Sequence, residues 1–160
     1  MPTQEPTFTS LAFGQGRFDY GDVLLASLPP RASRDPRAWA ETMFSPRSTP
    51  WPVKALFGIR MVLVPLLGLR PAPRGVFDVR EVKGEEALLA FDDDHLDFRC
   101  AVAVDPTAEI VRVTTVVRLR NGRGRLYFAP VSLLHPFVVH AMLRRARRIL
   151  AGEGTAAGRA

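Results

Sequence analysis

The chain of 160 residues is short of several residue types, and each shortage narrows the class of protein it can be. It has a single cysteine, Cys100, so it cannot form an intrachain disulfide, and we expect a cytoplasmic protein. Lysine occurs only at Lys54 and Lys83, so arginine supplies nearly all of the positive charge behind the net charge of +6. A positive net charge permits contact with a nucleic acid or an anionic membrane but is not evidence for either.

Motifs of several enzyme and binding classes are absent from the sequence. There is no G-x-S-x-G elbow, no phosphate-binding loop, no G-x-G-x-x-G fingerprint and no zinc-finger spacing. The aromatic stacking motifs of RNA-binding domains are absent too, so we do not expect a nucleic acid as partner. The chain has three histidines, and none falls into a three-ligand spacing, so we predict no metal and no cofactor.

The longest hydrophobic run covers residues 51–69, and Lys54, Arg60 and Pro65 interrupt it. A helix that spans a membrane needs about 20 largely uncharged apolar residues. We therefore interpret this run as a buried or cavity-lining helix.

The length and the hydrophobic content of 47% suit one domain with a single core. Residues 1–16 lack a basic segment followed by an apolar run, so we expect no signal peptide there and interpret them as a flexible lead-in. The domain is expected to cover residues 17–151. Residues 152–160 are mostly small, and we expect a disordered tail.

The hydrophobic pattern predicts one strand, two helices, a run of strands and a final helix. An apolar stretch at residues 23–28 ends at a proline pair, which is typical of a strand end. Asp35 and Pro36 suit the cap and first position of a helix, and a second helix is expected from Trp51 to about Pro65. From residue 76 the apolar period is two, which predicts strands at 76–82, 86–91, 96–104, 109–119 and 125–129.

The short separators between these strands predict an antiparallel meander. Asn121-Gly122 between two alternating runs indicates a hairpin. The last helix is expected to have Pro136 in its first turn and to end at Gly152. Together these elements predict an α+β helix-grip fold, in which a curved antiparallel sheet wraps around the long C-terminal helix. The apolar stripe of that helix is predicted to contain Leu134, Val138, Met142 and Ile149.

The stretch FDDDHLDFR, residues 91–99, allows three interpretations: metal ligands, an acid–base pair of His95 and Asp97, or a turn. Strand parity favours the turn, with Leu96 and Phe98 inside and with His95, Asp97 and Arg99 on the outer face or the rim. Asp97 and Arg99 are then expected to pair at the surface. A bulge in this strand would reverse the assignment.

Polar side chains that parity places inside the sheet are the candidates for a binding site. Glu81 and Thr115 meet this condition, and His135 before the last helix could line the mouth of a cavity. A rim carboxylate and a satisfied core threonine are the alternative interpretation. The arginines of the last helix complement the helix dipole, which accounts for them without a partner. The apolar walls are predicted to be Phe77, Leu89, Phe98, Phe128, Val138 and Met142.

The runs DDDHLDFRCAV and VRVTTVVRLRNGRGRLYFAPVSLLHPFVVHAMLRRA resemble a bacterial family of uncharacterised domains. That family is placed in the START-like, or SRPBCC, superfamily with the helix-grip fold, which includes polyketide cyclases and pollen-allergen-like proteins. The resemblance covers about residues 18–150. It implies a cavity between the sheet and the last helix, and it implies no known reaction.

Three functions are therefore open at this stage. The first is binding of a small hydrophobic molecule, such as a lipid or a polyketide-like compound, in an internal cavity. The second is an enzyme of cyclase or dehydratase type that uses a cavity carboxylate or histidine. The third is an interaction module that uses the basic last helix, which leaves contact with a membrane surface open. A monomer and a homodimer are both compatible with the sequence.

Overall fold

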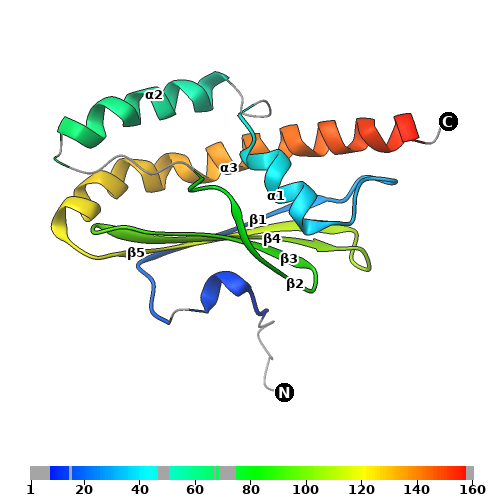
Figure 1. Cartoon of the computed structure of the whole chain (residues 1–160), viewed down its shortest axis with the longest axis horizontal. Helices are drawn as coiled ribbons and strands as arrows, with labels where there is room; N and C mark the ends of the chain where they lie inside the picture. Colours follow the sequence, from blue (N-terminus) through cyan, green and yellow to red (C-terminus); the bar gives the residue numbers. More distant parts are fainter. Residues whose placement is uncertain (1–7, 15, 47–50, 67, 69–74, 158–160) are drawn as a thin grey trace, which may run out of the picture.

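The computed structural model describes residues 8–157 with the exception of 15, 47–50, 67 and 69–74. Figure 1 shows a sheet with helices packed on one side and a short helical turn on the other. In chain order the elements are η1 (Leu11–Phe13), β1 (Tyr20–Ser27), α1 (Pro36–Phe44), α2 (Trp51–Leu66), β2 (Val79–Lys83), β3 (Glu86–Asp92), β4 (Leu96–Asp105), β5 (Ile110–Leu119) and α3 (Gly122–Ala157).

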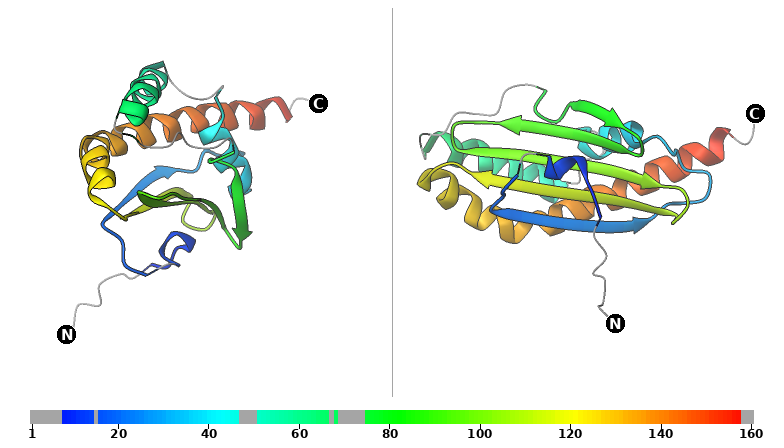
Figure 2. Two further views of the ribbon diagram at one scale, coloured as in Figure 1. Left: turned by 60° about the vertical axis from the view of Figure 1, so that its left-hand side comes forward. Right: turned by 90° about the horizontal axis from the view of Figure 1, so that it is seen from below.

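The five strands form one curved antiparallel sheet in the order β1-β5-β4-β3-β2. Short turns join β2 to β5 as a meander, and β1 pairs with β5, so the first strand lies beside the last. The helices α1, α2 and α3 cover one face, and η1 lies against the other (Figure 2). The predicted α+β arrangement, with a curved sheet and a long C-terminal helix in the helix-grip manner, is confirmed.

Helix α1 begins where the sequence predicted it. The Asp35 side chain accepts a hydrogen bond of 2.9 Å from the Arg37 backbone N–H, and Pro36 occupies the first turn. Both features are favourable at a helix N-terminus. The side chains of Trp39, Ala40 and Met43 are fully buried against the sheet and α3.

The predicted strand parity is confirmed on β4 and β5. Alternate residues of each strand, such as Val102 and Val113, are paired in register and face the helices. The predicted turn at Asp93 and Asp94 is also confirmed, because the Asp93 backbone N–H donates to the Leu96 carbonyl oxygen at 2.9 Å. Cys100 is buried on the inner face, as expected of a lone thiol in an apolar run.

The inner face carries two core clusters, and each lies toward one end of the strands. The first core cluster packs against α1, Val53 of α2 and the C-terminal half of α3, and the second packs against Val64 of α2 and the N-terminal part of α3. The first contains Trp39, Met43, Val53, Leu89, Val102, Val113, Met142 and Leu143, among others. The second contains Val64, Leu96, Val117, Tyr127 and Phe128, with Tyr20, Phe91, Phe98, Leu119 and Val131 partly buried around it.

The predicted Asn-Gly hairpin and the predicted strand at 125–129 are wrong, because α3 begins at Gly122. Asn121 acts as a helix cap instead: its Oδ1 accepts a hydrogen bond of 2.9 Å from the Gly124 N–H. Its Nδ2 also donates to the Asp94 carbonyl oxygen at 3.0 Å, which ties the helix start to the β3–β4 turn. As a consequence Phe128 reaches the core from a helix rather than from a strand, and Leu126 of the same turn is exposed.

Helix α3 is much longer than the sequence predicted. Pro130 and Pro136 lie inside it, and it continues past Gly152 to Ala157. The part over Gly122–Gly152 is long and apolar enough by composition to cross a membrane, but the core helix of a soluble protein passes the same test. The helix does pack on β1 and α1, and Leu134 of the predicted stripe is exposed. Its buried stripe is Val139, Met142, Leu143, Ala146 and Leu150.

Strand β2 is shorter than predicted and has an irregularity between Val79 and Glu81. Past this irregularity Glu81 pairs with Leu88, whose side chain lies on the outer face. Glu81 is therefore exposed, and its predicted inward placement is wrong. The alternation of apolar and polar residues in the sequence does not reveal this register shift. A bulge reverses the face of the sheet to which the following residues point.

The predicted pairing of Asp97 with Arg99 is also wrong, although both lie on the outer side of β4. Arg99 pairs with Asp92 on the neighbouring strand, and Arg120 pairs with Asp97 at 2.7 Å. Arg99 lies opposite Ala90, so Asp92 is its diagonal neighbour on β3, and Arg120 lies two residues beyond Arg118, the register partner of Asp97. Long side chains reach such diagonal neighbours across strands. On the same face Glu86 anchors η1, since its carboxylate accepts a hydrogen bond of 2.7 Å from the Leu11 N–H.

Candidate functional site

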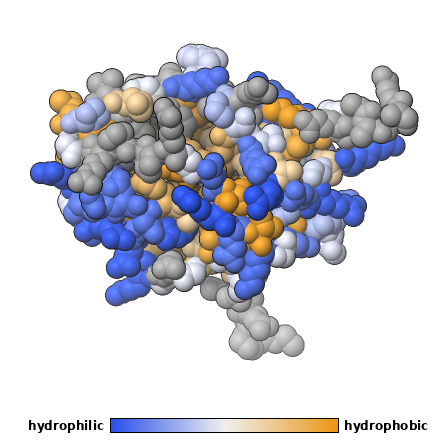
Figure 3. Space-filling model, in the orientation of Figure 1, coloured by the Kyte–Doolittle hydropathy of each residue, from blue (hydrophilic) through white to orange (hydrophobic). Residues whose placement is uncertain are grey.

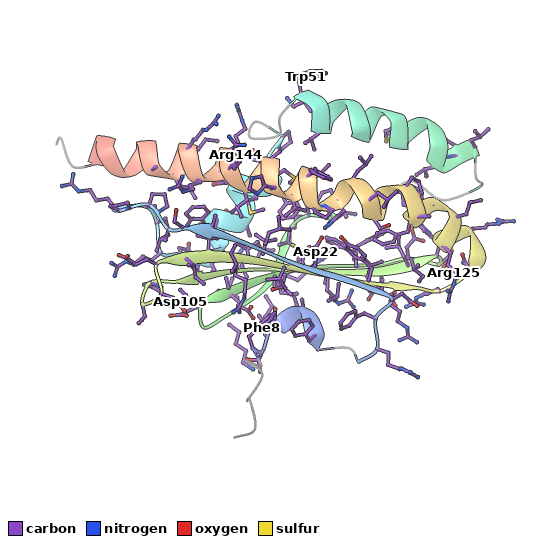
Figure 4. All side chains as sticks on the ribbon, turned by 180° about the vertical axis from the view of Figure 1, so that it is seen from behind. Phe8, Asp22, Trp51, Asp105, Arg125 and Arg144 are labelled. Atoms are coloured by element: carbon purple, nitrogen blue, oxygen red, sulfur yellow. The ribbon has the colours of Figure 1, made fainter. Side chains whose placement is uncertain are left out.

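A polar cluster lies on the inner face of the sheet where the two core clusters meet. Tyr20 and Asp22 are two positions apart on β1, so both side chains face α3. Asp22 is opposite Thr115 on β5, and Thr115 is opposite Cys100 on β4. His135 approaches the same point from α3, and Figure 4 shows Asp22 in the layer between β1 and that helix.

Asp22 is the centre of this cluster. Its Oδ2 accepts a hydrogen bond of 2.6 Å from the Tyr20 hydroxyl and lies 2.7 Å from Nδ1 of His135. The Asp22 and His135 side chains are 14% and 15% exposed, so the pair is largely withdrawn from water. The other carboxylate oxygen, Oδ1, is buried and makes no hydrogen bond among the residues that the structure describes.

The charge state of the cluster follows from these contacts. Burial raises the pKa of Asp22, but the hydrogen bonds from His135 and Tyr20 outweigh burial and lower the pKa below its ordinary value of 3.8. The Thr115 hydroxyl adds only a smaller effect in the same direction. Burial and the neighbouring Asp22 raise the pKa of Tyr20. At neutral pH the cluster therefore holds a carboxylate beside a protonated phenol.

The cluster has apolar walls. The Tyr20 ring meets Phe128 edge-on at 5.1 Å and His135 edge-on at 5.7 Å. Phe98 is packed against both core clusters, and Val64 of α2 belongs to the second. In such surroundings an unpaired carboxylate oxygen is costly, and a buried polar atom without a partner calls for an explanation.

The predicted site residues separate into two groups in the structure. Thr115 and His135 lie at the polar cluster, and Phe98 and Phe128 lie beside it in the second core cluster. Leu89, Val138 and Met142 belong to the first core cluster or pack against it, as does Phe77, whose ring stacks on Phe44 at 5.2 Å. Glu81 is exposed on β2 and is brought together with neither group.

The two residues at the centre, Tyr20 and Asp22, were not among the predicted site residues. The predicted first strand began at residue 23, whereas β1 begins at Tyr20. Extending the alternation backwards from Leu24 would have placed Asp22 and Tyr20 on the inner face, so the signal was present in the parity. The low apolar content of the segment Asp19–Asp22 hid it.

His95 and Asp97 do not form the acid–base pair that the sequence left open. His95 is buried at the rim, where its Nδ1 lies 3.1 Å from Oδ2 of Asp93 and its ring meets Tyr127 edge-on at 6.2 Å. Asp97 pairs instead with Arg120. Within the described ranges, no three histidine, cysteine, aspartate or glutamate side chains gather in a way that could hold a metal ion.

The polar cluster can act on a bound molecule in two ways. Asp22 holds Nδ1 of His135, so Nε2 is the ring nitrogen that can contact a bound molecule. Asp22 Oδ1 can accept a hydrogen bond from a donor placed between the sheet and α3.

The fold and this cluster define an α+β helix-grip domain with a buried carboxylate–imidazole pair. The chain belongs to a family described as a protein of unknown function (DUF2867), whose match covers residues 15–142. The match includes Tyr20, Asp22 and His135. Comparison of the chain with curated proteins and with solved structures gave no match.

Proposed function

We propose that this protein binds a small, mostly hydrophobic molecule between the sheet and the helices α2 and α3. The molecule carries one hydrogen-bond donor, which the polar cluster of Tyr20, Asp22 and His135 recognises. The single observation behind the proposal is the buried Oδ1 of Asp22, which lacks a hydrogen-bond partner among the described residues although it lies in apolar surroundings. A donor on a ligand satisfies this atom.

Three further features support this function. The sheet is curved and holds a long helix against one face, an arrangement that suits a ligand site between the two layers. The polar groups are few and the walls are apolar, as in sites for lipids and aromatic compounds. The resemblance to the START-like superfamily points to the same class of ligand. We also propose that the protein is cytoplasmic, since its one cysteine is a buried free thiol.

The proposal is tested by titration calorimetry with a panel of fatty acids, hydroxylated lipids and aromatic polyketides. We expect binding to the members that carry a hydroxyl or an amide, and we expect Asp22→Asn to weaken it by about 10- to 100-fold because the charged acceptor is lost. Thr114→Val is the matched control, since Thr114 is buried on the opposite face of the same sheet. Equal affinity of Asp22→Asn and the wild type would contradict the proposed site.

An enzyme of cyclase or dehydratase type is the second candidate, and the Asp22–His135 distance of 2.7 Å favours it. A histidine held by a carboxylate is suited to general acid–base catalysis. If the protein is such an enzyme, a bound polyketide-like molecule changes its structure during incubation, and His135→Gln binds it without the change. Mass spectrometry of the extracted molecule at successive times separates this outcome from simple binding.

A further inference from the structure

The outward side of α3 carries one continuous stripe of exposed residues. Leu126, Pro130, Leu133, Phe137, His140, Arg144 and Arg148 recur at helical spacing and are all exposed. Leu133 and Phe137 are 74% and 75% exposed, which is unusual for large apolar side chains in consecutive turns. The stripe is apolar in the N-terminal half of α3 and cationic in the C-terminal half.

Helix α2 adds apolar surface to the same layer of the molecule. Trp51, Met61 and Leu66 are largely exposed, and among the α2 side chains that the structure describes, Val53 and Val64 are buried in the core clusters. Hydrophobic residues are visible at the surface at the left-hand end of α2 in Figure 3. Figure 4 shows Trp51 on α2 and Arg144 on α3, both on the side of the sheet away from Phe8.

Over nearly all of their length, α2 and α3 carry charges of one sign. The segments Trp51–Leu66 and Gly122–Gly152 contain lysine and arginine but no aspartate or glutamate. The one acidic residue of α3, Glu153, lies near its C-terminal end, and the other acidic residues that the structure describes lie on the sheet, on its turns, on α1 or in the segments next to these. Arg147 is held to the sheet by bonds to Ser27, whereas Arg144 and Arg148 lie on the exposed stripe.

We propose that the exposed stripe of α3, together with α2, docks on the surface of an anionic lipid membrane. Exposed leucine and phenylalanine side chains beside arginines, with no acidic residue among them, are the features of helices that lie in the headgroup region. The helix lies on the membrane and does not cross it, because its other stripe is buried in the core. Docking places α2 and α3 against the membrane, in which hydrophobic ligands dissolve.

The same features disfavour the other occupants. A second copy of the chain on this surface would bring arginines of both copies together without acidic partners. A nucleic acid would satisfy Arg144 and Arg148 but offers no apolar phase for Leu133 and Phe137, whose side chains would stay in water. An anionic membrane offers an apolar phase to Leu133 and Phe137 and negative charge to Arg144 and Arg148.

The test is flotation of the full chain with phosphatidylcholine vesicles, with and without phosphatidylglycerol. We expect binding to the anionic vesicles that weakens as salt rises. Removing the charge with the double variant Arg144→Gln/Arg148→Gln is expected to weaken binding by about fivefold for each arginine. Leu133→Ser/Phe137→Ser is expected to weaken it by about tenfold or more. The control is Leu25→Ser, because Leu25 is 58% exposed on the opposite face of β1.

Each other outcome overturns the proposal. It is wrong if the wild type does not float with anionic vesicles, or if Leu25→Ser weakens flotation as much as Leu133→Ser/Phe137→Ser does. A loss that follows only the arginines, with competition by duplex DNA, would assign the surface to a polyanion. Sedimentation of a wild-type dimer that Leu133→Ser/Phe137→Ser converts to monomer would assign it to a second copy. All variants change exposed residues, and circular dichroism checks that they fold.

Discussion

The two core clusters of the inner face differ in chemistry although the same strands pass through both. The first core cluster, under α1 and the C-terminal half of α3, is lined by apolar side chains such as Trp39 and Val102. The second, under Val64 of α2 and the N-terminal part of α3, borders the polar cluster of Tyr20, Asp22 and His135. From this difference we expect the first core cluster to provide most of the stability, and the proposed function assigns ligand recognition to the other end of the sheet.

The largest expected effect on stability comes from the first core cluster. Trp39→Ala removes a side chain with no exposed surface, together with its indole hydrogen bond of 2.7 Å to the Ser33 carbonyl oxygen. We expect a loss of about 3–5 kcal/mol in the free energy of unfolding, measured with urea. The chain's other tryptophan is the control: Trp51 is 79% exposed, and Trp51→Ala should change stability by less than about 0.5 kcal/mol. Similar losses in the two variants would contradict this assignment of the core.

A smaller loss is expected at Gly124, where the first turn of α3 meets the rim of the sheet. A Cβ at this position would collide with the His95 backbone carbonyl group. Gly124→Ala should therefore destabilise the protein by about 1–3 kcal/mol, because helix and turn must separate. Gly152→Ala is the matched control in the same helix, since a Cβ there meets nothing within 4 Å. Thermal unfolding should show that Gly152→Ala raises the free energy of unfolding by up to about 1 kcal/mol. An increase in the same quantity for Gly124→Ala would refute the close contact.

The pH dependence of stability tests the polar cluster. Because the folded-state pKa of Asp22 lies below 3.8, its charged form stabilises the folded protein at neutral pH. This contribution is lost as the pH falls below about 3.8 and through the folded-state pKa. Asp22→Asn should lower the free energy of unfolding by about 1–2 kcal/mol at neutral pH. The difference in unfolding free energy between variant and wild type should shrink in acid. Tyr20→Phe removes one of the two hydrogen bonds to the Asp22 carboxylate. It should lower the free energy of unfolding by a smaller amount. Parallel curves of unfolding free energy against pH would contradict the account.

The smallest effect concerns Cys100, which lies in register with Thr115 at the border of the two clusters. Burial raises the pKa of its thiol to about 12, so the reactive thiolate is scarce near neutral pH. We expect a thiol reagent to modify Cys100 only when the chain unfolds, with a rate that follows the urea transition. Rapid labelling of the native protein would show that the layer between sheet and helices opens more than these contacts indicate.

Much of the fold could be predicted because its signals are local. Asp35 and Pro36 marked the start of α1, and the alternation of β4 and β5 fixed which residues face the helices. The start of α3 could not be predicted in this way, because Asn121 and Gly122 suit a hairpin as well as a helix cap. In the structure the helix cap is accompanied by a contact distant in sequence, the bond from Asn121 to the Asp94 carbonyl oxygen, which the local pattern does not reveal.

The candidate site was predicted less well because it is assembled from distant parts of the chain. His135 and Thr115 could be singled out as polar residues near apolar positions. Their partner Asp22 lies on the first strand, and only the pairing of β1 with β5 brings it to Thr115. Glu81 was misplaced for a related reason, since the irregularity of β2 depends on its pairing with β3.

The most direct test of the central claim is native mass spectrometry of the protein purified from its host, compared with the denatured mass. The account predicts that the wild type retains a small hydrophobic molecule with a hydrogen-bond donor, and that Asp22→Asn purified in parallel retains less of it. A wild type that carries no molecule, and that binds none of the lipids and polyketides in the panel, would contradict the proposed ligand site.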